Sequence, residues 1–433
     1  MVNSKADEKK WDCVIIGGGI SGLVAANFLR RSGKTVLIIE KSKKVGGRAI
    51  TKEVKGGFLN LGPHALYEDG HSMQILKELG ISLEGGSPDI DGILLSKNVL
   101  CPLPTSPFSL LTSKLIDWKG KMELIQFYLK LERGKEEPLK HVSFKDWLDE
   151  HIHSEKAKQF LLTLMRLSTY CSNPDDLSAE VVFKRLRMKK TIYLKNGWQT
   201  MVDALREEAV KMGVAIVSGC SAQSITGTFP KMQVKTNDNR ILLARNVLST
   251  LDPSSLSRLV QEHEHSGSLH FLTEMRPVYS ASLDVILDSI PKPSVSFALS
   301  LDSGFYFSNH SKVTKLSRND KHEVIHVLKY VNSDEQLSKE EQEAQLLSFM
   351  GLIQPGWEKS VVYKRYLHNM VVTHVNSKGG VSTRPDPEVL QLPGLYIAGD
   401  WVGDEGWLVD ASFKSAEKAA ARIVEREGDL ING

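Results

Sequence analysis

Glycines cluster near the N-terminus, directly after a short apolar run. The run Cys13–Ile16 is typical of a buried parallel strand, and the next six residues, 17–22, read GGGISG. Apolar residues then recur at helical spacing as far as Arg31, which gives the order strand, glycine turn and helix. Such a turn lets the backbone approach a phosphate closely, and the helix N-terminus offers free N–H groups and a positive dipole end. The predicted chemistry is pyrophosphate binding.

A second β-rich run, Thr35–Ile39, ends in an acid. Glu40 follows 18 residues after Gly22. A carboxylate at this place can accept both hydroxyls of an adenosine ribose and would repel a 2′-phosphate. The alternative is a glycine turn that serves tight packing alone. The complete βαβ unit argues against that alternative and predicts a dinucleotide site.

A second glycine pair distinguishes between the dinucleotides. The segment 45–51 reads VGGRAIT, so Arg48 follows Gly46 and Gly47. An NAD enzyme does not need this loop. A flavin dinucleotide is longer and more buried, and a loop with a cationic fork can close over its pyrophosphate from the opposite side. FAD is therefore the predicted cofactor.

Together with Thr51, these motifs resemble the N-terminal signature of the FAD-dependent amine oxidase superfamily. That group includes monoamine and polyamine oxidases, protoporphyrinogen oxidase and phytoene-type carotenoid desaturases. The whole pattern is most similar to bacterial phytoene desaturase-like FAD oxidoreductases. The resemblance implies an α/β fold, with a discontinuous Rossmann-like FAD-binding domain and an inserted α+β substrate domain whose mixed sheet is flanked by helices.

Three further segments extend the resemblance. Residues 57–67 (GFLNLGPHALY) are similar to the segment that passes the isoalloxazine in this group. Residues 392–401 (LPGLYIAGDW) end in the Gly-Asp pair whose Asp binds the ribityl and pyrophosphate region in the family, which assigns that role to Asp400. The segment around 221–225 corresponds to the one that passes the adenine, although Ala222 stands where a valine is commoner.

The last predicted helix, 408–424, follows the Gly-Asp motif. Its apolar residues share one face, and Asp410 and Ser412 are expected to cap its start. Its positive dipole end would then point at the flavin and stabilise the negative charge of the reduced form. A helix that only docks on the domain is the alternative.

The predicted FAD-binding residues are Gly17, Gly19, Ile20, Ser21, Gly22, Glu40, Lys41, Gly46, Gly47, Arg48, Gly62, Pro63, His64, Ala65, Ala222, Gly399, Asp400, Leu408 and Val409. No catalytic residue is assigned, and the weak candidates are His64, Trp401 and Trp407. His64 either donates to the flavin or a substrate, or orders its turn. The four cysteines form no CxxC pair, so no metal site is expected and the chain is interpreted as a cytoplasmic protein.

The motif positions predict two interwoven domains. Residues 1–85, 191–251 and 386–433 would form the FAD-binding domain, and 86–190 and 252–385 the substrate-binding domain. Helices are expected at 122–133, 143–151, 155–167 and 339–349, and strands at 278–287, 294–301, 304–307 and 323–330. Loop residues that could reach a substrate are Tyr306, His310, Lys364, His368 and His374, with ordinary surface or packing roles as the alternative.

Composition limits the partners. The chain has 433 residues, 41% hydrophobic and 25% charged, with a net charge of +3, which is typical of a globular protein and gives no field for nucleic acid. The basic run 184–190 (KRLRMKK) could touch an anionic lipid surface, which makes peripheral membrane contact an alternative to a solvated connection. Motifs HExxH, GxSxG and the Walker loop are absent from the sequence.

The predicted function is two-electron oxidation of a small organic substrate such as an amine, a porphyrinogen or a polyene. A hydride would pass to the flavin, and oxygen or another acceptor would reoxidise it. The alternatives are a non-redox isomerase or mutase that uses FAD, and a protein that keeps a vestigial flavin fold. The sequence does not decide the substrate, the electron acceptor or the oligomeric state.

Replacing the ribose-binding acid gives a direct test. We expect Glu40→Ala to weaken FAD binding by about 1.5–3 kcal/mol, because hydrogen bonds to a charged group are lost. Titration of the apoprotein with FAD measures the change. An unchanged affinity would refute the ribose role of Glu40.

Overall fold

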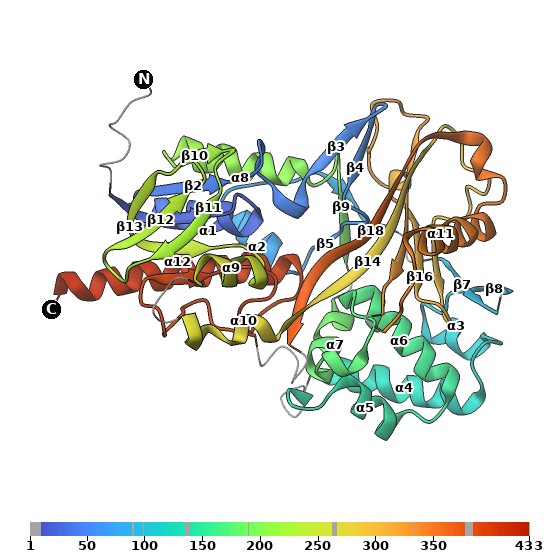
Figure 1. Ribbon diagram of the computed structural model, residues 1–433. Helices are drawn as coiled ribbons and strands as arrows, with labels where there is room; N and C mark the ends of the chain where they lie inside the picture. Colours follow the sequence, from blue (N-terminus) through green and yellow to red (C-terminus); the bar gives the residue numbers. More distant parts are fainter. Residues whose placement is uncertain are drawn as a thin grey trace.

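Two seven-stranded sheets organise the chain (Figure 1). The computed structural model describes residues 10–88, 91–97, 99–134, 139–188, 190–261, 266–332, 334–376 and 384–432. The first sheet lies near both chain ends, and the second lies beside a cluster of helices built from residues 107–187 (Figure 1).

The first sheet has the strand order β10-β2-β1-β13-β12-β11, and β19 pairs with the far end of β13. Its centre is parallel and buried on both faces, because β1 and β2 are runs of apolar residues. The strands are β1 Trp11–Ile16, β2 Val36–Glu40, β10 Ala215–Ser218, β11 Ala222–Thr226, β12 Met232–Thr236, β13 Ile241–Ser249 and β19 Leu395–Ile397.

Helices cover both faces of this sheet. Cys13 and Ile15 face one apolar cluster with α1, α2, α8 and α12, whereas Val14 and Ile16 face another with α9 and α10. This alternation follows from the two-residue period of the strand. The helices are α1 Ile20–Arg31, α2 His71–Glu78, α8 Gln199–Lys211, α9 Pro253–Leu259, α10 Phe271–Glu274 and α12 Val409–Asn432. The packing of α1 on α12 joins the two ends of the chain (Figure 1).

The second sheet has the order β18-β14-β17-β16-β15-β7-β8. One face packs on α11, and the other shares an apolar cluster with α3 to α7. The strands are β7 Ile93–Ser96, β8 Val99–Pro102, β14 Met275–Leu287, β15 Phe297–Ser300, β16 Phe305–Asn309, β17 Glu323–Tyr330 and β18 Val361–Asn376. The helices are α3 Pro107–Thr112, α4 Trp118–Arg133, α5 Phe144–His151, α6 Glu155–Thr169, α7 Ala179–Arg187 and α11 Lys339–Ile353.

Short strands connect the two halves. The hairpin of β3 (Thr51–Val54) and β4 (Gly57–Asn60) leads from the second glycine loop toward the second sheet. A small sheet of β5 (Leu66–Tyr67), β9 (Thr191–Leu194) and β6 (Gly85–Gly86) lies between the halves. The predicted division into two domains stays a prediction; α9 and α10, which it assigns to the substrate domain, pack on the first sheet.

The strand β18 corrects one expectation. Lys364, His368 and His374 lie on this 16-residue strand and not in loops, and Tyr306 lies on β16. His310 lies in a short 3-10 turn, His310–Lys312. The strand was missed because most of β18 is only half-buried, so its sequence lacks the apolar alternation that marks β17.

The expected caps of the last helix are also corrected. The carboxylate of Asp410 accepts from the backbone N–H and hydroxyl of Ser72 at 2.9 and 2.7 Å, so it caps α2 and not its own helix. The Ser412 hydroxyl donates to the Leu408 carbonyl. Arg185 pairs with Asp410 at 3.3 Å, with both side chains buried, which ties the helical cluster to α2 and α12.

Part of the basic run 184–190 is engaged inside the molecule, whereas the side chains of Lys184 and Lys190 are 57% and 76% exposed. Besides Arg185, Lys184 pairs with Glu180, and Arg187 donates to the Leu131 carbonyl; Lys189 lies outside the described residues. These partners account for the run as a structural connection, and its contact with a lipid surface stays a prediction. Within the described ranges, no helix combines the length and apolar character needed to cross a membrane.

Candidate active site

The glycine turn 17–22 is open where a phosphate would approach and closed where the helix packs. A Cβ on Gly19 would meet nothing within 4 Å, whereas a Cβ on Gly22 would lie 2.1 Å from the Gly17 carbonyl oxygen. Gly19 is the N-cap of α1, no side chain caps the helix, and its first turn holds no acid. The first N–H groups of α1 are therefore available to an anion.

The second glycine loop touches the first. The Gly46 N–H donates to the Gly18 carbonyl at 2.8 Å, and a Cβ on Gly47 would lie 3.4 Å from the Gly19 Cα. The two loops, whose contacting glycines are 28 residues apart in the sequence, thus share one wall of the site. Side chains at these positions would separate them.

Glu40 lies directly behind the glycine turn. Its two carboxylate oxygens accept from the backbone N–H groups of Gly18 and Ser42, each at 2.8 Å. Each oxygen keeps a second lone pair that a ribose hydroxyl could use. The Cys220 N–H donates to the Glu40 carbonyl at 3.0 Å, so the segment that leads to Ala222 runs beside this acid, as the adenine assignment requires.

Arg48 and Asp400 form a bidentate ion pair. The two guanidinium nitrogens lie 2.9 and 2.8 Å from the two carboxylate oxygens, across 352 residues of sequence. Arg48 also donates to the Val372 carbonyl, so it joins the glycine loop, the C-terminal motif and β18. The Asp400 side chain is 4% exposed and that of Arg48 is 52% exposed, which leaves the guanidinium open to a bound group.

Burial alone would raise the pKa of the Asp400 carboxyl, but Arg48 and His374 lower it below its ordinary value. His374 is buried beside the pair, and its Nδ1 has no hydrogen-bond partner in the described part of the chain. Its own pKa is lowered by burial and by Arg48, although Asp400 opposes this shift. Of the substrate-loop candidates, His374 thus lies at the cofactor motif.

Arg384 is a site residue that the sequence analysis missed. It donates to the carbonyls of Asp400 and Gly406 at 3.1 and 2.9 Å and lies over the Trp407 ring, so it holds the loop after the Gly-Asp pair. Burial lowers its pKa to about 10, and it is charged at neutral pH. The only hint in the sequence was its place shortly before the C-terminal motif.

The two tryptophan candidates have structural partners. Trp401 donates to the Leu251 carbonyl at 3.2 Å within the core of the first sheet. Trp407 donates to the Thr169 carbonyl at 2.9 Å in the apolar cluster of the helices. Gly399 and Ser415 exchange hydrogen bonds at 3.0 Å, which anchors the Gly-Asp turn on α12.

The turn 62–64 lies against the second sheet. A Cβ on Gly62 would be 3.0 Å from the Met370 methyl and 3.4 Å from the Ser282 hydroxyl. The Tyr170 hydroxyl donates to the Pro63 carbonyl at 3.1 Å. The segment predicted to pass the isoalloxazine therefore sits where the two halves of the molecule meet.

His64 is held within this turn. Its Nδ1 lies 3.0 Å from the Gly62 carbonyl, and its ring meets Trp198 edge-on at 4.5 Å. Because a carbonyl only accepts, Nδ1 carries the proton. Enclosure lowers the pKa of His64 to about 4, so it is neutral at neutral pH. The turn-ordering interpretation has direct support, and a role toward the flavin stays a prediction.

A row of polar side chains crosses the second sheet below this turn. Arg365, Asp284, His326 and Ser308 are successive cross-strand neighbours on β18, β14, β17 and β16. One Asp284 oxygen accepts from His326 Nδ1 at 2.7 Å and from Ser282 at 2.9 Å, and the other accepts from Arg365. Sequence analysis did not find this row, because its members lie on separate strands.

The central pair of the row is completely buried. Burial alone would raise the pKa of Asp284, but His326 and Arg365 lower it, so the carboxylate is ionised. Since a carboxylate only accepts, His326 holds a proton on Nδ1, and its Nε2 has no partner among the described residues. The pair thus presents an imidazole that a fixed anion orients, with one ring nitrogen left without a partner in the described part of the chain.

Aromatic side chains pack beside the row. The His310 ring stacks on Tyr193 at 3.6 Å and meets His326 edge-on at 4.6 Å. Tyr170 meets Tyr330 edge-on at 5.6 Å. Burial raises the pKa of both tyrosines well above the usual value, so both hydroxyls are neutral.

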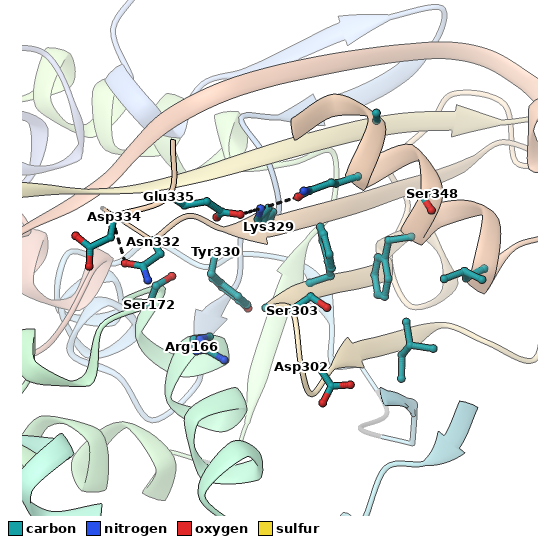
Figure 2. Close-up of a pocket in the computed structure, with 17 residues that line it drawn as sticks. Arg166, Ser172, Asp302, Ser303, Lys329, Tyr330, Asn332, Asp334, Glu335 and Ser348 are labelled. Atoms are coloured by element: carbon teal, nitrogen blue, oxygen red, sulfur yellow. Dashed lines mark hydrogen bonds and ion pairs between the residues drawn. The ribbon is translucent and has the colours of Figure 1, made fainter. Parts of the chain in front are cut away.

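A cleft of about 830 Å³ opens on the other side of Tyr330 (Figure 2). Figure 2 shows Arg166 of α6 and the Ser303 turn beside the Tyr330 ring, with the Lys329–Glu335 pair along one wall. Tyr330 lines the cleft and contacts Tyr170, whose hydroxyl bonds the 62–64 turn. Two aromatic side chains therefore connect the cleft with that turn.

The remaining predicted positions are placed as follows. Ile20 and Ser21 begin α1, Lys41 is exposed after β2, and Ala65 follows the 62–64 turn. Leu408 has a positive φ of 54° directly before α12, and Val409 is the first residue of that helix.

These features fit FAD. The uncapped α1 with its open Gly19 position can hold a pyrophosphate, Glu40 has free lone pairs, and the 62–64 turn offers a wall for the flavin ring. The fold and this site define a dinucleotide-binding flavoprotein.

The chain belongs to the flavin containing amine oxidoreductase family, whose model matches residues 20–424. This match confirms the predicted superfamily and FAD as its cofactor. The α/β fold with a Rossmann-like part is confirmed by solved structures. An oxidoreductase from Methanosarcina mazei has a TM-score of 0.77 at 21% identity, over 95% of this chain and 99% of that one.

Curated relatives match over shorter stretches. Putrescine oxidase from Kocuria rosea is 30% identical over 156 residues, which cover 34% of this chain and 32% of the relative. Protoporphyrinogen oxidase 1, chloroplastic, from Arabidopsis thaliana is 25% identical over 181 residues, covering 40% and 33%. The matched stretches thus span about a third of each of these relatives.

Two glycines separate cofactor binding from folding. Gly19→Ala should leave the unfolding free energy within about 0.5 kcal/mol of wild type, because its methyl group meets open space. The same methyl should lower FAD affinity about tenfold or more, because it stands where the pyrophosphate approaches. Gly22→Ala should instead destabilise the apoprotein by roughly 1–3 kcal/mol through overpacking against Gly17. Urea unfolding and FAD titration measure both; normal FAD affinity in Gly19→Ala would place the pyrophosphate elsewhere.

The Asp400 carboxylate gives a pH dependence with a defined sign. Because its folded-state pKa is lowered, its ionised form stabilises the fold above the unfolded value of about 3.9. That contribution disappears as the pH falls through the lower folded-state value. We expect the stability difference between wild type and Asp400→Asn to be roughly 1–3 kcal/mol near neutral pH and to shrink below about pH 4. A pH-independent difference in urea unfolding would contradict this.

Proposed function

We propose that the chain is an FAD-dependent oxidoreductase that removes two electrons from a small organic substrate. The observation that carries the proposal is the junction of the 62–64 turn with the Asp284–His326 row, because it puts an oriented imidazole next to the predicted flavin segment. Family membership supports the reaction class.

Different residues of the chain would bind different parts of the cofactor. The α1 N-terminus and Gly47 would hold the pyrophosphate, Glu40 the ribose, Ala222 the adenine side, and Asp400 the ribityl region. Leu408 and Val409 would direct the α12 N-terminus at the flavin, which lies against residues 62–65. Arg48 would keep Asp400 ionised and face the phosphates. When bound, FAD supplies the electron acceptor for the substrate's hydride.

The substrate site is proposed between the 62–64 turn and the polar row. His326 would accept at Nε2 the proton that the substrate loses, and Asp284 would stabilise the resulting imidazolium. Both carboxylate oxygens of Asp284 already accept from protein donors, so this acid is engaged and does not await a substrate cation.

The enclosing tyrosines favour a neutral, largely apolar substrate. Tyr170, Tyr193 and Tyr330 offer ring faces and neutral hydroxyls. Among the relatives, putrescine oxidase, protoporphyrinogen oxidase and 4,4′-diapolycopen-4-al dehydrogenase carry names of three substrate classes. The tyrosine enclosure favours the polyene or porphyrinogen class over a small diamine. The cleft beside Tyr330 would be the outer end of the substrate's route.

A non-redox function is the second candidate. A UDP-galactopyranose mutase from Mycoplasma pneumoniae is 33% identical over 122 residues, 28% of this chain and 30% of the relative. A product with no net oxidation would favour it. The electron acceptor would be oxygen or another small molecule, and the cytoplasm is kept as the proposed location because the four cysteines are free.

Anaerobic reduction of the holoprotein tests the proposed reaction. We expect a polyene or porphyrinogen to bleach the oxidised flavin spectrum, and small diamines to leave it unchanged. Reduction by diamines alone would overturn the substrate proposal. Failure of refolded protein to acquire a flavin spectrum with excess FAD would overturn the cofactor assignment.

His326→Gln tests the proton acceptor. We expect flavin reduction to slow by about 10²-fold or more at unchanged FAD affinity, because a positioned general base contributes about this much. The pH dependence of reduction should also change, which loss of packing alone would not produce. A matched control is His368→Gln, since His368 lies exposed on β18. Equal rates in both variants would remove His326 from the reaction.

A further inference from the structure

Exposed apolar side chains gather in one region away from the proposed site. Of the thirteen large hydrophobic side chains that are exposed in the described part of the chain, seven lie between residues 99 and 129. The most exposed of these seven are Phe108 at 76%, Trp118 at 68% and Val99 at 60%. Single exposed apolar residues are normal, but this concentration in one segment is not.

Helix α4 has apolar residues on two opposite faces. Leu124, Phe127 and Leu131 are buried in the apolar cluster of the helices. At the 100° step of a helix, Trp118, Met122 and Leu129 project from the opposite side and are exposed. An ordinary surface helix has one apolar stripe. The fold explains the first face, and no described residue covers the second.

Helix α3 continues the exposed face. Phe108 and Leu111, one helical turn apart, are both exposed. The Lys121 ammonium donates to the Leu111 carbonyl at 2.6 Å, which fixes the start of α4 against the end of α3. Figure 1 shows α3 and α4 at the outer edge of the helical cluster, far from the first sheet.

The net charge around these side chains is positive. Lys114 lies between the two helices and Lys119 in the first turn of α4, and both are exposed. The nearby acids accept hydrogen bonds from neutral groups and keep their charge: the exposed Asp117 accepts from Gly120 and Ser154, and the half-buried Glu123 accepts from the backbone of residues 153 and 154. Lys114, Lys119 and Lys121 outnumber these two acids, so this surface favours an anionic partner.

We propose that this α3–α4 surface, made of Phe108, Leu111, Lys114, Trp118, Lys119 and Met122, docks on an anionic lipid bilayer. Trp and Phe rings are favourable at the level of the lipid headgroups, and lysines beside them attract anionic headgroups. A second copy of the chain fits less well, because a twofold interface would bring the same lysines of both copies together. This location differs from the basic run 184–190, in which Arg185 and Arg187 are engaged internally.

Flotation with vesicles tests the docking surface. Full-length protein should bind vesicles of phosphatidylcholine with phosphatidylglycerol, and bind pure phosphatidylcholine weakly. Phe108→Ser with Trp118→Ser should lower the partition coefficient about tenfold or more. Lys114→Ala with Lys119→Ala should lower it roughly fivefold per lysine on anionic vesicles. The control, Val210→Ser with Leu390→Ser, removes two exposed apolar side chains elsewhere, at 47% and 75% exposure, and should bind like wild type.

Tryptophan fluorescence gives a second measurement. Of the seven tryptophans, Trp118 is exposed and Trp11 is half-buried, whereas Trp147, Trp198, Trp357, Trp401 and Trp407 are buried. In the wild type, anionic vesicles should protect part of the tryptophan fluorescence from quenching by iodide. The substitution Trp118→Phe should abolish this protection. Absence of vesicle binding, or equal binding by all variants, would overturn the proposal. Wild-type protein could instead fail to bind vesicles and form a dimer that the double variant Phe108→Ser with Trp118→Ser dissociates. That result would assign the surface to a second copy of the chain. The flavin content of each variant shows whether that variant is folded. Vesicle binding does not depend on the proposed oxidation reaction.

Discussion

The bidentate ion pair between Arg48 and Asp400 is the interaction on which the arrangement of the site depends. It joins the second glycine loop to the C-terminal motif, and through Val372 it also reaches the second sheet. A buried carboxylate is costly without a charged partner, so the three segments are constrained to meet. The first glycine loop is then fixed by its backbone contact with Gly46, and Glu40 by the N–H groups of that loop and of Ser42.

A second polar arrangement faces the first across the 62–64 turn. Asp284 is ionised between His326 and Arg365 in the middle of a largely apolar sheet. Burying such a row costs free energy unless every charge is paired. In the described part of the chain, the Nδ1 of His326 is bonded to Asp284 and its Nε2 has no partner. Buried polar and charged side chains are thus concentrated where the 62–64 turn meets the second sheet. The proposed chemistry and the tyrosine enclosure both concern this junction.

Much of the fold was predictable because its signals are local. The βαβ unit showed itself through apolar strands, a glycine turn and a terminal acid, and β17 has its predicted bounds. Individual side-chain contacts were harder to predict from the sequence. The sequence suggested Asp410 as a cap for its own helix, but it caps α2 and pairs with Arg185, since its partners are 338 and 225 residues away. Lys364, His368 and His374 were expected in loops, because a half-buried strand such as β18 lacks a clear apolar alternation.

By itself, the sequence determined the cofactor class and the segments that must converge, because glycine spacing and strand-end acids are local requirements of a pyrophosphate and a ribose. Only the tertiary structure decided which side chains meet there. Arg365, Asp284, His326 and Ser308 become neighbours through strand register, and Arg384 reaches the Gly-Asp loop through folding of a distant segment. Register and buried pairing are properties of several strands at once, so no single stretch of sequence carries them.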